Sequence, residues 1–145
     1  MKLCVGDFPM LNTPLKLVQR AETKLFQLFI KSQEVKKFFG ENIFQGIVEA
    51  NTVANTKRFV LIHRISGDPL DKTLSDRGDL LRSVRVQVDV MSTNYADATE
   101  GSEIIRSLSE TEFPSCVDGD HYGTTQIGQN IWHIQSVDFI LEEGA

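Results

Sequence analysis

The feature that most constrains this chain is the strict alternation of residues 83–90, SVRVQVDV. Valine occupies every second position, while a serine, an arginine, a glutamine and an aspartate fill the positions between. Because successive side chains of a β-strand point to opposite faces, this pattern predicts a strand from about Leu81 to Met91 with one apolar and one polar face. The valines require a covering layer, and we expect the helix that follows them to provide it.

Two segments predict the main helices. The Thr13-Pro pair is a helix start signal, because Thr caps free backbone N–H groups and Pro needs no donor at the first helical position. Apolar residues at helical spacing then continue to about Lys31. Asn94 is expected as the N-cap of the second main helix, which ends near Glu110. A short helix is predicted over residues 32–39, between a serine cap and a closing glycine.

The remaining segments predict further strands and two irregular connections. Residues 58–66, RFVLIHRIS, are rich in β-branched and aromatic side chains and predict a central strand. Residues 131–142 predict the closing strand, and residues 43–48 have weak strand character. The polar segment 67–79 is predicted to be a long loop, and residues 115–130 are predicted to be a turn-rich connection with room for a short strand at its start.

The order of these elements predicts the class of fold. A chain of 145 residues fits one domain, and we expect a single domain over residues 1–145. Helix, weak strand, strand, loop, strand, helix and strand form an α+β pattern, with a mostly antiparallel sheet of about four strands and two main helices packed on one face. The second face of the sheet would be free to meet partners.

Composition and motifs argue against several classes of function. The net charge is -5, and arginines alternate with acidic residues, so no basic stripe for nucleic acid is expected. No segment has the roughly 20 apolar residues of a membrane span, and no signal peptide is predicted. Glycine-rich phosphate motifs are missing, and Cys4 and Cys116 are expected to be free thiols. We therefore expect a cytoplasmic protein without cofactor, bound metal or enzymatic activity.

One short segment carries residue types that could do chemistry. A thiol, two carboxylates and an imidazole lie within six positions, at Cys116, Asp118, Asp120 and His121. The Asp-Gly-Asp sequence within it is also typical of turns. A small metal-dependent hydrolase or ligand-binding α+β domain that uses this cluster is therefore the less favoured interpretation.

A family resemblance extends over residues 58–110. An apolar strand, RFVLIHRISG, is followed by a polar segment, DKTLSDRGDLL, and then by RSVRVQVDVMSTNYADATEGSEIIRSL, in which an R-x-Q-V-D-V strand leads through a small polar turn to a Tyr- and Ala-rich helix. This arrangement resembles the tail terminator, or tail completion, family of long-tailed bacteriophages and prophages. The resemblance implies a small α+β virion protein that forms a ring, usually a hexamer, on the finished tail tube, stops its polymerisation and provides the surface for joining the head.

The resemblance implies partners in place of a substrate. These are other copies of the chain, the major tail tube protein and a head-completion or connector protein, with assembly in the cytoplasm of a bacterial host and a final location in the tail or neck of the virion. A neck or head-completion protein is the alternative role. The polar face of the strand could also be an ordinary solvated face. If it is an interface, the candidate residues are Arg85, Gln87 and Asp89, with Asp71, Lys72, Asp76, Arg77 and Asp79 in the polar segment.

Overall fold

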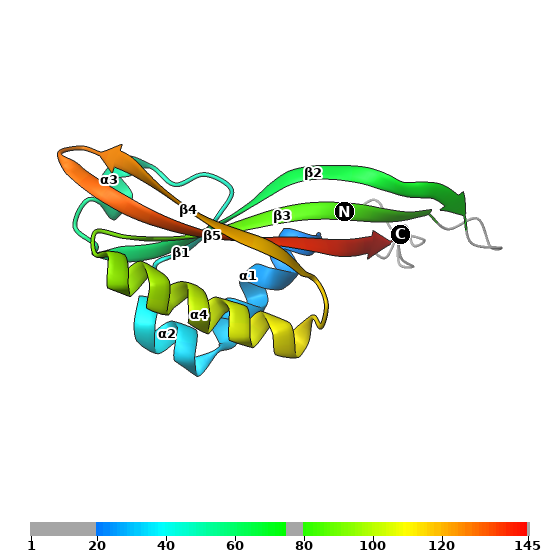
Figure 1. Ribbon diagram of the computed structural model, residues 1–145, viewed down its shortest axis with the longest axis horizontal. Coiled ribbons are helices and arrows are strands. Elements are labelled where there is room, and N and C mark those ends of the chain that lie inside the picture. Colours follow the sequence, from blue (N-terminus) through cyan, green and yellow to red (C-terminus); the bar gives the residue numbers. More distant parts are fainter. Residues whose placement is uncertain (1–19, 75–79, 145) are drawn as a thin grey trace, which may run out of the picture.

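The computed structural model describes residues 20–74 and 80–144, which form a five-stranded sheet with helices packed mainly on one face (Figure 1). The strand order is β1-β2-β3-β5-β4, and only β1 and β2 pair in parallel. The predicted α+β class and the mostly antiparallel sheet are confirmed, with one strand more than the four expected. In chain order the elements are α1 (Ala21–Lys31), α2 (Gln33–Phe39), β1 (Ile43–Gln45), α3 (Ala50–Val53), β2 (Arg58–Leu74), β3 (Leu80–Ser92), α4 (Tyr95–Glu112), β4 (Val117–Ile127) and β5 (Asn130–Gly144).

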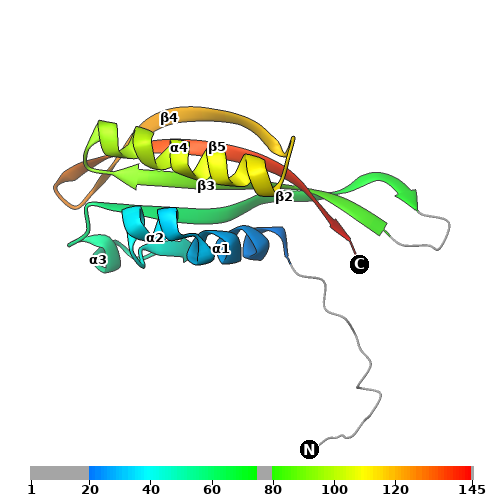
Figure 2. The same ribbon diagram turned by 90° about the horizontal axis from the view of Figure 1, so that it is seen from below.

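The strand of alternating valines is β3, which lies in the middle of the sheet between β2 and β5. All four valines are fully buried, and they form the core together with side chains from α1, α2 and α4. Figure 2 shows these three helices lying along one side of the sheet. Complete burial of a valine stabilises the fold by up to about 1.5–3 kcal/mol, so this strand alone explains why the helix layer must cover it.

Local capping signals set the helix boundaries. The Asn94 side chain accepts hydrogen bonds from two backbone N–H groups of the first turn of α4, at 2.8 and 3.2 Å, as predicted. The Ser32 side chain accepts one from the Val35 N–H at 3.3 Å, and Gly40 closes α2 with a φ of 64°. The first main helix ends at Lys31 as expected, but it begins only at Ala21, because Arg20 before it is extended, so the predicted continuous helix was too long. The predicted start signal at residue 13 lies outside the described residues.

The polar segment that predicted a long loop is mostly strand. β2 continues to Leu74 and β3 begins at Leu80, so the two strands form a hairpin arm that extends past the helix layer (Figure 1). Irregular pairing between Arg64 and Ser66, and again between Pro69 and Leu74, accommodates the turn-forming residues within the ladder. Cross-strand backbone pairing satisfies polar backbone groups whatever the side chains are, so local polarity was a poor guide to this segment.

The turn-rich connection predicted over residues 115–130 is also a strand. β4 runs from Val117 to Ile127 and pairs with β5 along its length, and the hairpin closes at Gly128, whose φ is 64°. A register shift between Val117 and Gly119 leaves Asp118 as an extra residue in the strand. Pairing with a long, apolar partner strand therefore outweighs the turn preferences of the Asp-Gly-Asp sequence.

Candidate functional site

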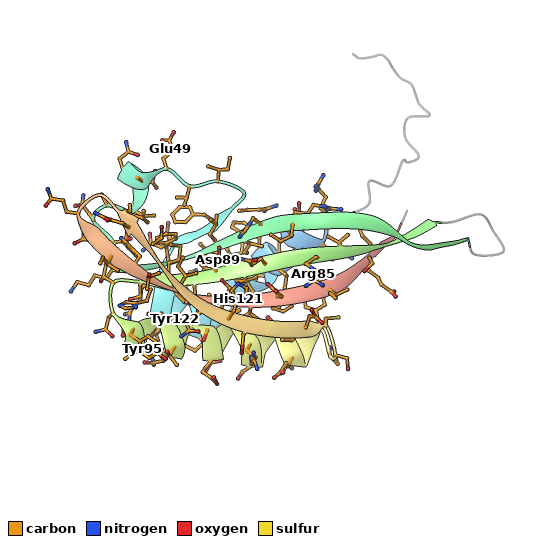
Figure 3. The ribbon with its side chains drawn as sticks, turned by 45° about the horizontal axis from the view of Figure 1, so that its top comes forward. Glu49, Arg85, Asp89, Tyr95, His121 and Tyr122 are labelled. Atoms are coloured by element: carbon orange, nitrogen blue, oxygen red, sulfur yellow. The ribbon has the colours of Figure 1, made fainter. Side chains whose placement is uncertain are left out.

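The sheet face opposite the main helices is divided into a covered end and an open end. At the covered end, which the sequence did not predict, Val53 of α3 packs into a cluster with Phe59, Met91 and Trp132. Beyond this cluster lies the polar face of β3, where Figure 3 shows Arg85 and Asp89. The second face of the sheet, which was expected to be free, is therefore covered at one end and open at its polar end.

Asp89 is the centre of a hydrogen-bond network on this face. Its Oδ1 accepts hydrogen bonds from the Ser136 hydroxyl at 2.6 Å and the Gln87 amide at 2.8 Å. Its Oδ2 lies 3.0 Å from Nε2 of His63. The register of the sheet creates the network, because Asp89 stands opposite Ser136 on β5, and Gln87 stands opposite His63 on β2. The Asp89 side chain is only 13% exposed, so its carboxylate is bound mainly within the chain.

Opposing effects set the charge states of this network. Burial alone would raise the pKa of Asp89, but hydrogen bonds from His63, Ser136 and Gln87 outweigh burial and hold that pKa below its ordinary value. The hydrogen bond to Asp89 raises the pKa of His63, although burial acts in the opposite direction. Each partner thus favours the charged form of the other, and the network holds the open face in one arrangement.

The network is not a hydrolytic triad. In a triad the nucleophile contacts the histidine, whereas here Ser136 and His63 both bind Asp89. The Ser136 side chain is also buried beneath the surface. The arrangement therefore orders polar side chains and does not activate a serine.

The other sequence-predicted interface residues lie in different surroundings. Arg85 is 39% exposed and its Nη1 lies 3.1 Å from Oδ2 of Asp118 and 3.8 Å from Oδ2 of Asp138. Asp71 and Lys72 lie in the hairpin arm, near the end of β2. The structure therefore brings Arg85, Gln87 and Asp89 together on one face and places the other two on the arm. Asp76, Arg77 and Asp79 lie outside the described residues.

The alternative chemical cluster is dispersed by the strand that contains it. Asp118 pairs with Arg85 on the open face, whereas Asp120 pairs with Arg106 of α4 on the helix side. Burial, together with the negative charge of Glu142, raises the pKa of the Cys116 thiol and so disfavours a reactive thiolate. Within residues 20–74 and 80–144, no three His, Cys, Asp or Glu side chains are placed to hold a metal ion. The geometry therefore gives the hydrolase interpretation no support.

A second ion network, absent from the sequence prediction, ties α1 to the sheet. Arg64 donates from Nη1 to Glu22 at 2.9 Å and from Nη2 to Glu143 at 2.8 Å. Glu143 also accepts the N–H of Ala21 at the start of α1, at 2.8 Å. The hydrogen bond from Arg64 lowers the pKa of Glu143 to about 2. These residues are far apart in the sequence, so no local pattern could have joined them.

The fold is that of a small α+β domain, and no catalytic group is assembled among its described residues. None of its described helices combines the length and apolar character needed to span a membrane. Neither a protein-family model nor a curated protein sequence matches the chain. Among solved structures, a chain from "Virion of native gene transfer agent (GTA) particle" is similar, with a TM-score of 0.52 and 9% identity, over 85% of this chain and 94% of that chain. At this identity the similarity shows a shared fold.

Proposed function

We propose that this chain is a structural protein of a phage-like virion and acts as the tail terminator. It would form a ring on the finished tail tube, stop further polymerisation and provide the surface that receives the head. The observation that carries the proposal is the fold shared with a chain of a gene transfer agent virion over 94% of that chain. The resemblance of residues 58–110 to tail terminators supports the same role.

A ring of identical subunits needs two different surfaces on each subunit that meet around a rotation axis. The hairpin arm is our candidate for one of these contacts, or for a contact with the tail tube, because it extends away from the body of the domain (Figure 1). Asp71 and Lys72 lie on this arm, and Arg85 lies in β3 with its side chain partly exposed. We also include Asp76, Arg77 and Asp79 in the proposed contact, because they belong to the same polar segment of the sequence.

The Asp89 network would support this contact from beneath. The Gln87 side chain donates to Asp89, and Asp89 in turn binds side chains of both neighbouring strands, so the two residues fix the sheet from which the arm extends. An interface held rigid before binding loses less conformational entropy when the partner docks. We therefore assign Asp89 and Gln87 to shaping the surface and Arg85 to direct contact.

The charge of the chain is compatible with a ring through which DNA passes. Its net charge of -5 repels a polyanion and does not hold it. The partners would be other copies of the chain, the major tail tube protein and a head-completion protein, in the tail or neck of the virion.

Removal of the gene from its phage or prophage tests the proposal. Overlong tails without heads are expected, because tube growth would lack its stop signal. Tails of normal length that fail to join heads would instead indicate the alternative, a neck or head-completion protein. Normal infectious particles would refute both roles.

A single substitution tests the contact residue. Arg85→Glu should reduce the number of capped tails in electron micrographs, because it places a negative charge beside Asp118 and at the proposed contact. Lys57→Glu is a matched control with the same change of charge at an exposed position near α3. Equal numbers of capped tails for Arg85→Glu and the wild type would remove Arg85 from the interface. Asp89→Lys is less suitable because it would disrupt the buried network itself.

A further inference from the structure

The helix layer carries an acidic surface whose charges are not neutralised within the described part of the chain. Glu100, Glu103 and Glu110 follow the outward side of α4, where all three are exposed. They extend over roughly 15 Å, since each helical residue rises about 1.5 Å. None of the three forms a hydrogen bond or ion pair with another described residue. The acidic residue Asp97 and the basic residue Arg106 of this helix are, by contrast, engaged in ion pairs.

Two exposed tyrosines lie at the start of the same helix and on β4, which contacts it. Tyr95 at the start of α4 is 53% exposed, and Tyr122 of β4 is 48% exposed. Their ring centroids are 5.3 Å apart, and the Tyr122 hydroxyl lies 2.7 Å from Nδ1 of His133. Figure 3 shows the two tyrosines next to each other. Exposed aromatic side chains that are already held in place are typical anchors of protein interfaces. We define the acidic patch as these two tyrosines with the three glutamates.

A surface of opposite charge lies on the other helices of the same layer. Lys31 of α1 and Lys36 and Lys37 of α2 are exposed, and none of them has an ion-pair partner among the described residues. Ile30, 41% exposed, lies next to Lys31 in the chain. We define these four residues as the basic patch. Glu34 and Glu41 are exposed nearby and offset part of its charge.

We propose that the acidic patch of one copy of this chain docks on the basic patch of a second copy. Complementary charge selects the occupant, because one chain carries both the carboxylates and the ammonium groups that have no ion-pair partner within residues 20–74 and 80–144. The tyrosine rings can pack against Ile30 and the lysine stems, and a lysine above a ring adds a cation–π attraction. Where each copy offers its acidic patch to one neighbour and its basic patch to another, the contact is heterologous and closes into a ring when the rotation allows it. The ring rests on the proposed function, whereas the contact between two copies can be measured with the purified chain alone.

Charge reversal and restoration test the contact. Purified full-length chain is followed by sedimentation velocity under reducing conditions, at about 0.05 and about 0.5 M salt. Wild-type chain should self-associate and dissociate as salt rises. The Glu103→Lys/Glu110→Lys variant and the Lys36→Glu/Lys37→Glu variant should each associate about tenfold more weakly. The chain that carries all four substitutions should recover most of the wild-type association, because complementarity is restored with the signs exchanged.

The controls separate this contact from general effects of charge. Glu49→Lys changes the net charge near α3, away from both patches, and should leave association unchanged. Lys and Glu have similar helix propensities, so the variants should keep their helices, which circular dichroism checks. A wild-type chain that stays monomeric up to about 1 mM would overturn the inference. Association of either double variant as strong as that of the wild type would also overturn it. So would association of the fourfold variant as weak as that of the double variants.

The charge-reversal experiment and the removal of the gene can fail independently of each other. Restored association together with normal tails in the gene deletion would leave the contact standing and overturn the tail terminator. Overlong tails in the deletion, with normal association of the charge-reversal variants, would leave the function standing and overturn the contact.

Discussion

Gly101→Ala should destabilise the protein, although alanine is the better helix former. Gly101 is buried in α4, where that helix crosses α2 and β3. A Cβ at this position would lie 2.7 Å from Cζ of Phe39 and 2.8 Å from Cγ1 of Val90. Val90 belongs to a strand paired on both sides, and the Phe39 ring packs edge-on against Phe38 with centroids 4.9 Å apart. Neither neighbour can move freely.

The net effect follows from two opposing magnitudes. Replacing glycine by alanine inside a helix gains about 1 kcal/mol. Forcing an extra methyl group into a packed core costs about 1–3 kcal/mol, and two contacts below 3.0 Å place this site in the upper part of that range. We therefore expect a net loss of about 1–2 kcal/mol in the free energy of unfolding and a fall of roughly 2–8 °C in Tm.

Urea unfolding followed by circular dichroism measures this loss. Ser107→Ala, at an exposed position of the same helix, is the control and should change stability by only a few tenths of a kcal/mol. In a Phe39→Leu background the cost of Gly101→Ala should shrink, because the nearest ring is removed. A Gly101→Ala variant as stable as the wild type, or more stable, would refute the packing argument.

Two further predictions concern the charge networks. Asp89→Asn should lower the pKa of His63 in an NMR titration, because the hydrogen bond to Asp89 raises that pKa in the wild type. The protonated His63 contributes stability that is complete below its ordinary pKa of 6.5. This stability is lost as the pH rises through the raised pKa of the folded protein. An unchanged pKa would show that Asp89 does not hold the histidine. Arg64→Met should destabilise the protein most at neutral pH, because it leaves Glu22 and Glu143 without their shared cation. Glu143 contributes stability above its ordinary pKa of 4.5 that is lost as pH falls toward about 2, so urea unfolding should show the gap to wild type narrowing in acid.

The local sequence predicted elements wherever one short-range force dominated. The alternating valines identified β3 and its buried face, and all four are fully buried. Asn94 and Ser32 identified the starts of α4 and α2, because a capping side chain acts on backbone groups within its own first turn. The same reasoning failed for the arm and for β4, where partners from distant strands satisfy the backbone.

The sequence by itself determined the fold class, the central strand and the polar identity of its open face, since periodicity and capping act over a few residues. Tertiary structure decided what those polar residues do. Sheet register brings Ser136 and His63 to Asp89, so a residue that the sequence offered as an interface charge is bonded within the chain. The folding of β4 sends Asp118 and Asp120 to opposite sides and disperses the apparent chemical cluster. Pairing between strands is a long-range interaction, and only the folded chain specifies which side chains it brings together.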